Sequence, residues 1–184
     1  MFDEKELIPK ILGGDLRAFD ILVKQYQRLV FHISFKLVNQ TDVAQDISQE
    51  VFIKVFRNLK SFAYQAKLST WIARIAYLTT LNHLKKQKRD SFEPYPADIE
   101  HFHFTNSNPE SELIGKDVNR YVNQLMSQLP HQYRLVLTLY HLEEFNYQEI
   151  ADVTELPVGT VKSYLFRGRK LLKAKLEDYL KNEN

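Results

Sequence analysis

Apolar residues recur at three- and four-residue spacing along three stretches of the N-terminal half, which is the pattern of amphipathic helices. The stretches cover residues 15–37, 39–62 and 68–89, and the last ends in a basic run. Asp15 is a candidate N-cap for the first, and Thr41 or Asp42 for the second. The second carries its inner stripe on Ala44, Ile47, Val51, Val55 and Leu59. The pattern predicts a compact helical bundle.

The same periodicity continues in the C-terminal half, where residues 117–130, 131–144, 145–156 and 157–176 each fit a helix. Between the halves, residues 90–113 show no sustained period and are rich in Ser, Asn, Pro and acidic residues. We therefore predict an all-α protein of two small helical domains on a flexible linker. The boundaries are 1–90, 91–113 and 114–184.

Composition agrees with a folded protein, with 44% apolar and 26% charged residues over 184 positions. The net charge is only +2, so any function that depends on positive charge must be local. No apolar run is long enough to span a membrane, and the acidic N-terminus does not resemble a signal peptide. The chain has no Cys, which fits a reducing compartment, and we expect a cytoplasmic protein.

Enzymatic motifs are absent from the sequence. There is no Gly-rich phosphate loop and no nucleophile motif, so we expect no catalytic residue and no cofactor. His101 and His103 lie in the linker without further clustered ligands, and we reject a metal site there. His32, His83, His131 and His141 lie on predicted helices at unrelated spacings.

Two short helices joined by a tight turn predict a helix-turn-helix in residues 145–176. Asn146 and Glu149 form a capping box, the small Ala151 allows close helix approach, Leu156 fills the turn, and Pro157 stands in the first turn of the second helix. The inward face comprises Val158, Val161, Leu165, Gly168 and Leu172. The outward face comprises Thr160, Lys162, Ser163, Phe166, Arg167 and Lys170.

No acidic residue occurs between positions 158 and 176. In a helix-turn-helix the outer face of the second helix enters the major groove, where Arg and Lys meet phosphates and bases. A solvated basic face or an acidic protein partner would also explain the charge. The turn, the capping box and the acid-free helix together favour DNA binding.

The N-terminal half offers two further candidate surfaces. The outward face of residues 39–62 is polar, and periodicity leaves open whether it is solvated or docks a protein. Beyond it, aromatic residues interleave with basic ones, a composition that suits unpaired nucleic acid. We expect Trp71 to be a core residue, and Tyr64 and Lys67 in the connecting loop to be the better contact candidates.

These motifs together resemble the extracytoplasmic-function (ECF) sigma factors of bacterial RNA polymerase. The resemblance rests on "GDLRAFDILVKQY", "DVAQDISQEVFIKVFRNLKSF", "LSTWIARIAYLTTLNHLKK" and "FNYQEIADVTELPVGTVKSYLFRGRKLL", in that order. It covers nearly the whole chain except the linker. It implies that residues 1–90 form sigma region 2 and residues 114–184 form region 4.

The resemblance also implies a role for each surface. Docking on the β′ coiled coil of core polymerase falls on Asp46, Gln49, Glu50, Ile53 and Arg57. Recognition and melting of the −10 element fall on Ala63, Tyr64, Gln65, Ala66, Lys67, Asn82, Lys85, Lys86, Lys88 and Arg89. Recognition of the −35 element falls on Thr160, Lys162, Ser163, Phe166, Arg167 and Lys170.

The implied partners are core polymerase (the β′ coiled coil and the β flap), promoter DNA and an anti-sigma factor, with a monomeric free chain and no small-molecule substrate. Two positions depart from the family pattern: Leu78 replaces an expected Asn, and Tyr164 stands where Arg is frequent. Tyr164 either shifts −35 preference or packs. The linker either threads toward the polymerase active centre or is a plain tether. The main alternative function is a two-domain regulator that binds operator DNA without polymerase.

Overall fold

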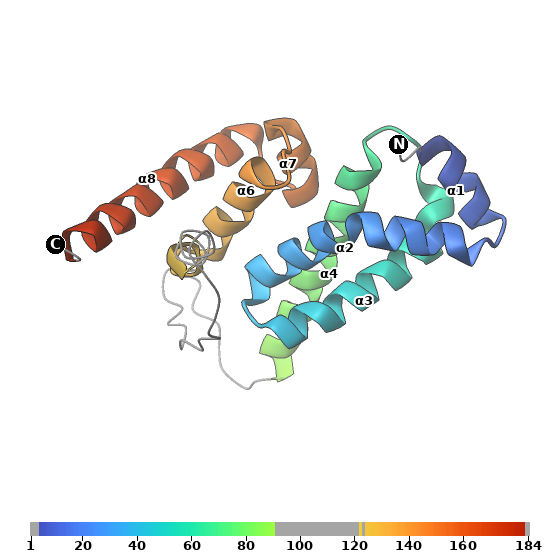
Figure 1. Cartoon of the computed structure of the whole chain (residues 1–184), viewed down its shortest axis with the longest axis horizontal. Helices are drawn as coiled ribbons and strands as arrows, with labels where there is room; N and C mark the ends of the chain where they lie inside the picture. The colour runs from blue at the N-terminus through green and yellow to red at the C-terminus, as the bar shows by residue number, and fades with distance from the viewer. Residues whose placement is uncertain (1–3, 91–121, 123, 183–184) are drawn as a thin grey trace.

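A computed structural model describes residues 4–90, 122 and 124–182 of the chain (Figure 1). Over these residues the regular structure is helical, with no strand, which confirms the predicted all-α class. The predicted linker, residues 91–113, lies outside the described residues. The helices are α1 (Glu4–Leu12), α2 (Leu16–Val38), α3 (Thr41–Asn58), the 3-10 turn η1 (Leu59–Ser61), α4 (Leu68–Asp90), α6 (His131–His141), α7 (Tyr147–Thr154) and α8 (Val158–Asn182).

Helices α1 to α4 form an N-terminal bundle in which α2, α3 and α4 pack on one another and α1 packs on α2. The inner stripe of α3 is buried as predicted, from Ala44 through Val55, because these positions share one face of the helix. Asp15 caps α2 as predicted: its carboxylate accepts the backbone N–H groups of Arg17 at 2.9 Å and Ala18 at 3.1 Å.

The predicted cap of α3 is wrong, because Thr41 is already the first helical residue. Gln40 occupies the N-cap position and makes no side-chain cap hydrogen bond. The connection from α2 is only two residues long. Asn39 ends α2 in the left-handed conformation at φ 57°, and its N–H donates to Phe35 O at 2.8 Å, which leaves Gln40 as the N-cap of α3. Asp42 falls within the first turn of α3, where a carboxylate favours the helix dipole.

Helix α1 was not predicted, because it is short, contains Pro9, and buries only a narrow stripe. Ile8 and Ile11 are 2% and 3% exposed and join the core of the bundle. The hydroxyl of Tyr26 in α2 donates to Glu4 at 2.7 Å and ties the two helices together. Burial and this contact raise the pKa of Tyr26.

Helices α6, α7 and α8 form a C-terminal bundle that contains the predicted helix-turn-helix. The capping box is confirmed: Asn146 accepts the Glu149 N–H at 3.0 Å, and Glu149 accepts the Asn146 N–H at 2.8 Å. Pro157 stands immediately before α8, where its carbonyl accepts the Val161 N–H at 3.1 Å. Gly168 lets α8 lie directly against α6, because a Cβ there would approach Leu137 to 3.0 Å.

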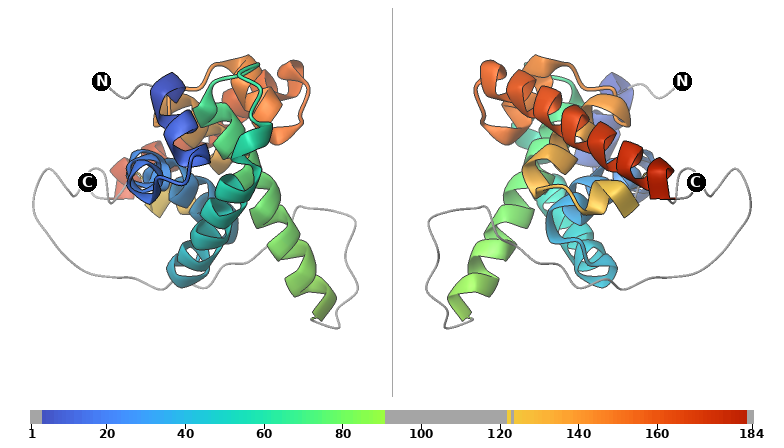
Figure 2. Two further views of the ribbon diagram at one scale, coloured as in Figure 1. Left: turned by 90° about the vertical axis from the view of Figure 1, so that its right-hand side faces the viewer. Right: turned by 90° about the vertical axis from the view of Figure 1, so that its left-hand side faces the viewer.

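The two bundles pack against each other, α2 against α6 and α4 against α7 (Figure 2). The buried residues of both bundles form one continuous apolar core. Two cations are also buried at the α2–α6 side, Lys36 at 8% and Arg134 at 1% exposure. Burial lowers the pKa of both, and Arg134 further lowers that of Lys36. Helix periodicity gave no indication of this contact between the bundles.

Candidate nucleic-acid and protein interfaces

The outward face of α8 carries the side chains predicted to contact the −35 element. Phe166 is 70% exposed although it is large and apolar. Lys162, Arg167 and Lys170 are also exposed, whereas Thr160 and Ser163 are half-buried. The predicted inward residues Val161 and Leu165 are almost fully buried. The first turns of α8 therefore present an exposed surface that mixes aromatic and cationic side chains.

Tyr164 packs within the protein. Its ring meets Tyr133 of α6 edge-on, with centroids 5.3 Å apart and planes at 87°. Tyr77 of α4 has its pKa raised by burial and by the nearby Glu155 and Tyr164. This flank of α8 is therefore close to the N-terminal bundle. Tyr164 packs, as one of the two sequence-based interpretations expected, and its effect on −35 preference stays a prediction.

The loop between η1 and α4 displays Tyr64 at the end of an aromatic stack. Tyr64 lies 4.8 Å from Phe62, which lies 5.5 Å from Trp71, measured between ring centroids. Phe62 is buried and Trp71 packs against the core, as expected for Trp71, while Tyr64 is 49% exposed. Tyr64 adopts φ 56°, a conformation that is rare for residues other than Gly. Both ring pairs are tilted, with planes at 54°, and the outermost ring is the exposed one.

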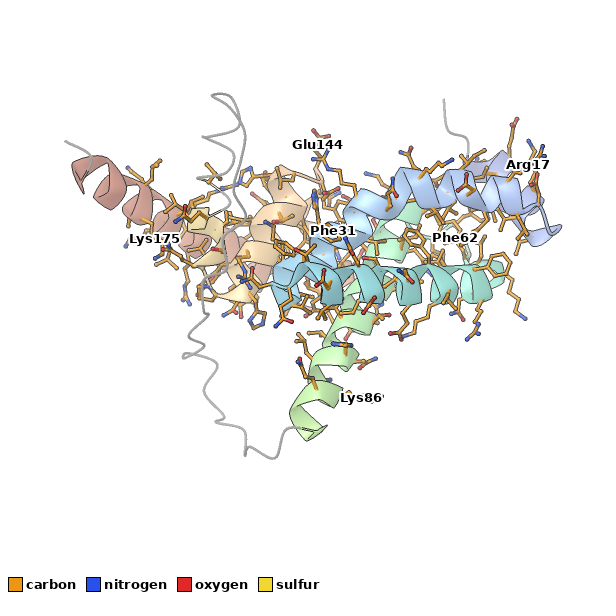
Figure 3. The ribbon with its side chains drawn as sticks, turned by 60° about the horizontal axis from the view of Figure 1, so that its bottom comes forward. Arg17, Phe31, Phe62, Lys86, Glu144 and Lys175 are labelled. Carbon is orange, nitrogen blue, oxygen red and sulfur yellow. The ribbon has the colours of Figure 1, made fainter. Side chains whose placement is uncertain are left out.

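The other residues of this loop are exposed, namely Ala63, Gln65, Ala66 and Lys67. Farther along α4, Asn82, Lys85 and Lys86 are exposed as well, and Lys86 lies where α4 extends away from the bundle (Figure 3). Leu78 is half-buried. Lys88 and Arg89 belong to the helix, but their side chains lie outside what the structure describes.

The outward face of α3 forms a continuous exposed stripe. All of the residues predicted to contact polymerase lie on it: Asp46, Gln49, Glu50, Ile53 and Arg57. Ile53 is 52% exposed, and the neighbouring Phe56, which sequence reasoning missed, is 42% exposed. Phe56 meets Phe19 of α2 edge-on at 4.9 Å. Two exposed apolar side chains among charges are typical of a protein-docking surface.

Ion pairs connect the bundles, and we call this set the interdomain clasp. Nζ of Lys67 lies 2.7 Å from Oε1 of Glu149, and Nη2 of Arg74 lies 2.5 Å from Oε1 of Glu155. Nη1 of Arg74 also donates to the backbone carbonyl of Asp152 at 2.8 Å. Nδ1 of His32 lies 2.6 Å from Oε1 of Glu143. In the clasp, acidic groups of the C-terminal bundle meet basic groups of the N-terminal one.

Glu149 takes part both in the capping box of α7 and in the interdomain clasp. Its partial burial works to raise its pKa, but the contacts with Lys67 and with the Asn146 N–H hold that pKa below its ordinary value. Lys67, predicted to contact DNA, therefore faces a carboxylate of the helix-turn-helix. Nothing in the local sequence of either residue predicts this pairing, because Lys67 lies in the loop before α4 and Glu149 lies in α7, far apart along the chain.

The described residues contain no group of three or more His, Cys, Asp or Glu side chains arranged to hold a metal ion. His101 and His103 lie outside them. Over the same residues, no helix is both long and apolar enough to cross a membrane.

Comparison with known proteins identifies the family of the chain. Residues 22–90 match the family model "Sigma-70 region 2", and residues 119–172 match "Sigma-70, region 4". The chain is 35% identical to RNA polymerase sigma-H factor of Pseudomonas aeruginosa, covering 97% of this chain and 96% of that protein. It is 32% identical to ECF RNA polymerase sigma-E factor of Haemophilus influenzae, with 95% of each covered.

Solved structures show the same fold. The sigma factor RpoE of Bartonella quintana, determined in complex with the anti-sigma factor NepR, is 20% identical, with a TM-score of 0.68 over 86% of this chain and 96% of that one. CnrH, determined in complex with the cytosolic domain of CnrY, is 19% identical. Its TM-score is 0.65, and the match covers 95% of this chain and 97% of that one. With matches to both sigma regions and relatives that span its whole length, the chain belongs to the ECF sigma factors of bacterial RNA polymerase.

Proposed function

We propose that this sigma factor engages core polymerase and promoter DNA through three separate surfaces. The stripe on α3 docks on the β′ coiled coil, the outward face of α8 enters the major groove of the −35 element, and the Tyr64 loop holds an unpaired base of the −10 element. We place these events in the cytoplasm. The chain supplies specificity and no catalytic group, while the core enzyme supplies the chemistry.

The observation that carries the proposal is the division of α8 into a buried flank and an exposed outward face. Phe166 is 70% exposed and lies among Lys162, Arg167 and Lys170. An exposed aromatic ring can contact thymine methyl groups, and Arg can bind guanine through two hydrogen bonds. The apolar residues that fix α8 on α6 lie opposite, so that DNA binding and folding use different side chains.

The Tyr64 loop supports the −10 assignment. A flipped base needs a flat partner to offset the cost of unstacking, which is about a few kcal/mol. Tyr64 is half-exposed and supplies an aromatic ring. That ring contacts Phe62, which in turn packs on Trp71, so it is held in place before a base arrives. Ordering the platform in advance lowers the entropic cost of binding.

Run-off transcription with core polymerase tests the proposal as a whole. Arg167→Ala should abolish initiation at promoters that depend on the −35 element while leaving co-purification with core polymerase intact. Ile53→Asp should abolish co-purification, and initiation with it, because it places a charge in an apolar contact. Tyr64→Ala should slow promoter opening, followed with a fluorescent base at −10, more than closed-complex formation.

Each variant has an outcome that contradicts its assignment. If Arg167→Ala also loses co-purification with core polymerase, or if Ile53→Asp retains it, the surfaces are not separate and the assignment is wrong. If Tyr64→Ala leaves the rate of promoter opening unchanged, the −10 role of its loop is wrong. If the chain binds DNA with full affinity but never stimulates core polymerase, the two-domain regulator is the correct function instead.

Promoter binding requires the interdomain clasp to open. The −10 and −35 elements are centred about 25 base pairs apart, roughly 85 Å along the duplex at 3.4 Å per base pair. Helix α8, at 25 residues, is only about 37 Å long. The clasp holds Lys67 of the −10 surface against Glu149, within the same helix-turn-helix as α8. The two DNA surfaces therefore cannot reach both elements while the bundles remain in contact.

An inhibitor that stabilises the closed arrangement would keep the factor inactive. The Bartonella relative was solved with an anti-sigma factor, and we infer that a protein of this kind binds the present chain across both bundles. Co-purification of the inhibitor should then fall when the clasp is disrupted by Arg74→Glu. Undiminished co-purification with that variant would contradict binding to the closed form.

A further inference from the structure

Four side chains from three helices of the C-terminal bundle form one continuous stack. The guanidinium of Arg169 in α8 lies 5.2 Å from the ring centroid of Tyr140 in α6. The rings of Tyr140 and Tyr147, the first residue of α7, lie parallel to within 16° at 5.3 Å. Nζ of Lys162 in α8 lies 5.5 Å from the ring of Tyr147. The order of the stack is thus cation, ring, ring, cation.

The two cations stand on the same flank of α8. Lys162 and Arg169 are two helical turns apart, so their side chains project in nearly the same direction. This flank is opposite to the one on which Tyr164 faces Tyr133 and the N-terminal bundle. The tyrosine pair spans the interval between the cations and fixes both from the side, because the negative face of an aromatic ring attracts a cation.

Neighbouring groups hold the stack together. Nε of Arg169 donates to Nε2 of His141 at 3.2 Å, which requires a neutral imidazole at that nitrogen. Burial and the nearby Arg169 lower the pKa of His141, so the neutral form is favoured. A hydrogen bond between the tyrosine side chains raises the pKa of Tyr147. Tyr147 therefore remains uncharged at neutral pH, and its contact with Lys162 is a cation–π contact and not an ion pair.

An exposed lysine on a helix ordinarily samples many rotamers, and binding a phosphate restricts them at an entropic cost. Lys162 is exposed, yet its ammonium is already drawn over the Tyr147 ring. A cation held over a ring still has hydrogen-bond donors facing outward, since the ring occupies only one side of the ammonium. The stack thus restricts the motion of the cation but leaves its charge intact, whereas a carboxylate partner would neutralise that charge.

We propose that Tyr147 is a positioning residue for DNA binding: together with Tyr140, it holds Lys162 and Arg169 in a row along one flank of α8, where they meet phosphates of a single DNA strand. This inference rests on the proposed DNA-binding role of α8. In a helix-turn-helix the first helix lies over the DNA backbone. Tyr147 opens that helix, so the stack lies where the backbone would pass.

The test is a double-mutant cycle in the full chain. The probe is a fluorescein-labelled, random-sequence duplex about two helical turns long, because phosphate contacts do not depend on sequence. Tyr147→Leu removes the ring but keeps an apolar side chain, and it should weaken binding about two- to five-fold. Tyr147→Phe retains the ring face for the cation and should bind within two-fold, on the order of the assay's scatter, of the unmodified chain.

Non-additivity distinguishes positioning from general destabilisation. In a Lys162→Gln background, Tyr147→Leu should cost little further affinity, because the cation that it positions is gone. If Tyr147→Leu weakens binding equally with and without Lys162, Tyr147 does not act through Lys162 and the inference is overturned. If Lys162→Gln itself leaves affinity unchanged, Lys162 does not meet phosphates and the inference is overturned, whereas the proposed −35 role still stands or falls with Arg167→Ala.

A spectroscopic readout separates the stack from any effect on DNA. Ring currents from Tyr147 should shift the ε-methylene protons of Lys162 upfield in the free protein. Tyr147→Leu should return these signals to the positions typical of exposed lysines, while Tyr147→Phe should retain the shift. Unshifted Lys162 signals in the unmodified chain would overturn the inference even if the affinities behaved as expected.

Discussion

Reversing the charge of Arg74 should separate the two bundles. Arg74 is the most heavily used side chain of the interdomain clasp: it pairs with Glu155 and donates to the Asp152 carbonyl. In Arg74→Glu both contacts are lost, and a carboxylate then faces Glu155. The effect on either bundle alone should be small, because Arg74 is exposed and leaves the cores untouched.

The magnitude follows from the exposure of the pair. The side chains of Arg74 and Glu155 are 46% and 53% exposed, so solvent screens their attraction. An exposed ion pair contributes about 0.2–1 kcal/mol, and a net hydrogen bond to a backbone carbonyl about 1 kcal/mol. Like-charge repulsion of similar size to the lost attraction brings the total to about 2 kcal/mol. That shifts the ratio of closed to open molecules roughly 30-fold.

The assay is energy transfer between dyes on the two bundles. The chain has no Cys, so Gln25→Cys on α2 and Lys170→Cys on α8, both exposed positions, provide labelling sites without background. Transfer should fall in Arg74→Glu. Raising KCl toward 1 M shortens the Debye length to about 3 Å and should lower transfer in the unmodified chain as well. The matched control is Arg17→Glu. It makes the same charge reversal on α2 but lies near the start of that helix, away from the clasp residue His32.

The decisive variant exchanges the two charges. Arg74→Glu combined with Glu155→Arg restores an attractive pair and should recover most of the transfer lost in the single variant. If the double variant remains as open as Arg74→Glu, the electrostatic reasoning is wrong. If Arg74→Glu leaves transfer unchanged, the apolar contacts of α2 with α6 hold the bundles together without the clasp.

Three further outcomes follow from local geometry. Gly168→Ala should lower the melting temperature, measured by circular dichroism, by a few degrees. Overpacking against Leu137 costs about 1–3 kcal/mol and outweighs a helix-propensity gain of about 1 kcal/mol. An increase in melting temperature would show that the Leu137 side chain moves to make room. Asn146→Ala should lower the free energy of unfolding in urea by about 1 kcal/mol, through loss of the cap on α7. Glu149, whose pKa is held below 4.5 by Lys67 and the Asn146 N–H, stabilises the fold above that pH and loses this effect as the pH falls through the lowered value. Glu149→Gln should therefore flatten the acid side of a plot of melting temperature against pH.

The parts of the fold that the sequence predicted are those that depend on local periodicity. The stripes on α2 and α3 repeat at helical spacing over several turns, and the capping box is a short-range pattern. The outward and inward faces of α8 were also predictable, because burial of Val161 and Leu165 fixes where Phe166 and Arg167 must point.

What the sequence did not predict depends on non-local contacts. Helix α1 is too short to be identified by periodicity, and its evidence is the burial of Ile8 and Ile11 against distant helices. Tyr164 has an orientation set by Tyr133 and Tyr77 rather than by its neighbours in the chain. The interdomain clasp joins residues of different bundles, and opposite charges are too common in the sequence for any one pairing to be singled out.

Glu149 uses a different carboxylate oxygen for each of its two contacts, and this affects the rate at which the bundles separate. Oε2 accepts the Asn146 N–H inside the capping box, and Oε1 faces Lys67 across the clasp. When a phosphate takes Lys67 away, the cap on α7 stays intact and no turn of helix has to be rebuilt. Opening therefore avoids the nucleation barrier of helix formation. Separation is then a rigid-body movement of finished domains, so its rate should follow solvent viscosity and ionic strength, and should respond to denaturant only through the apolar surface that the two bundles share.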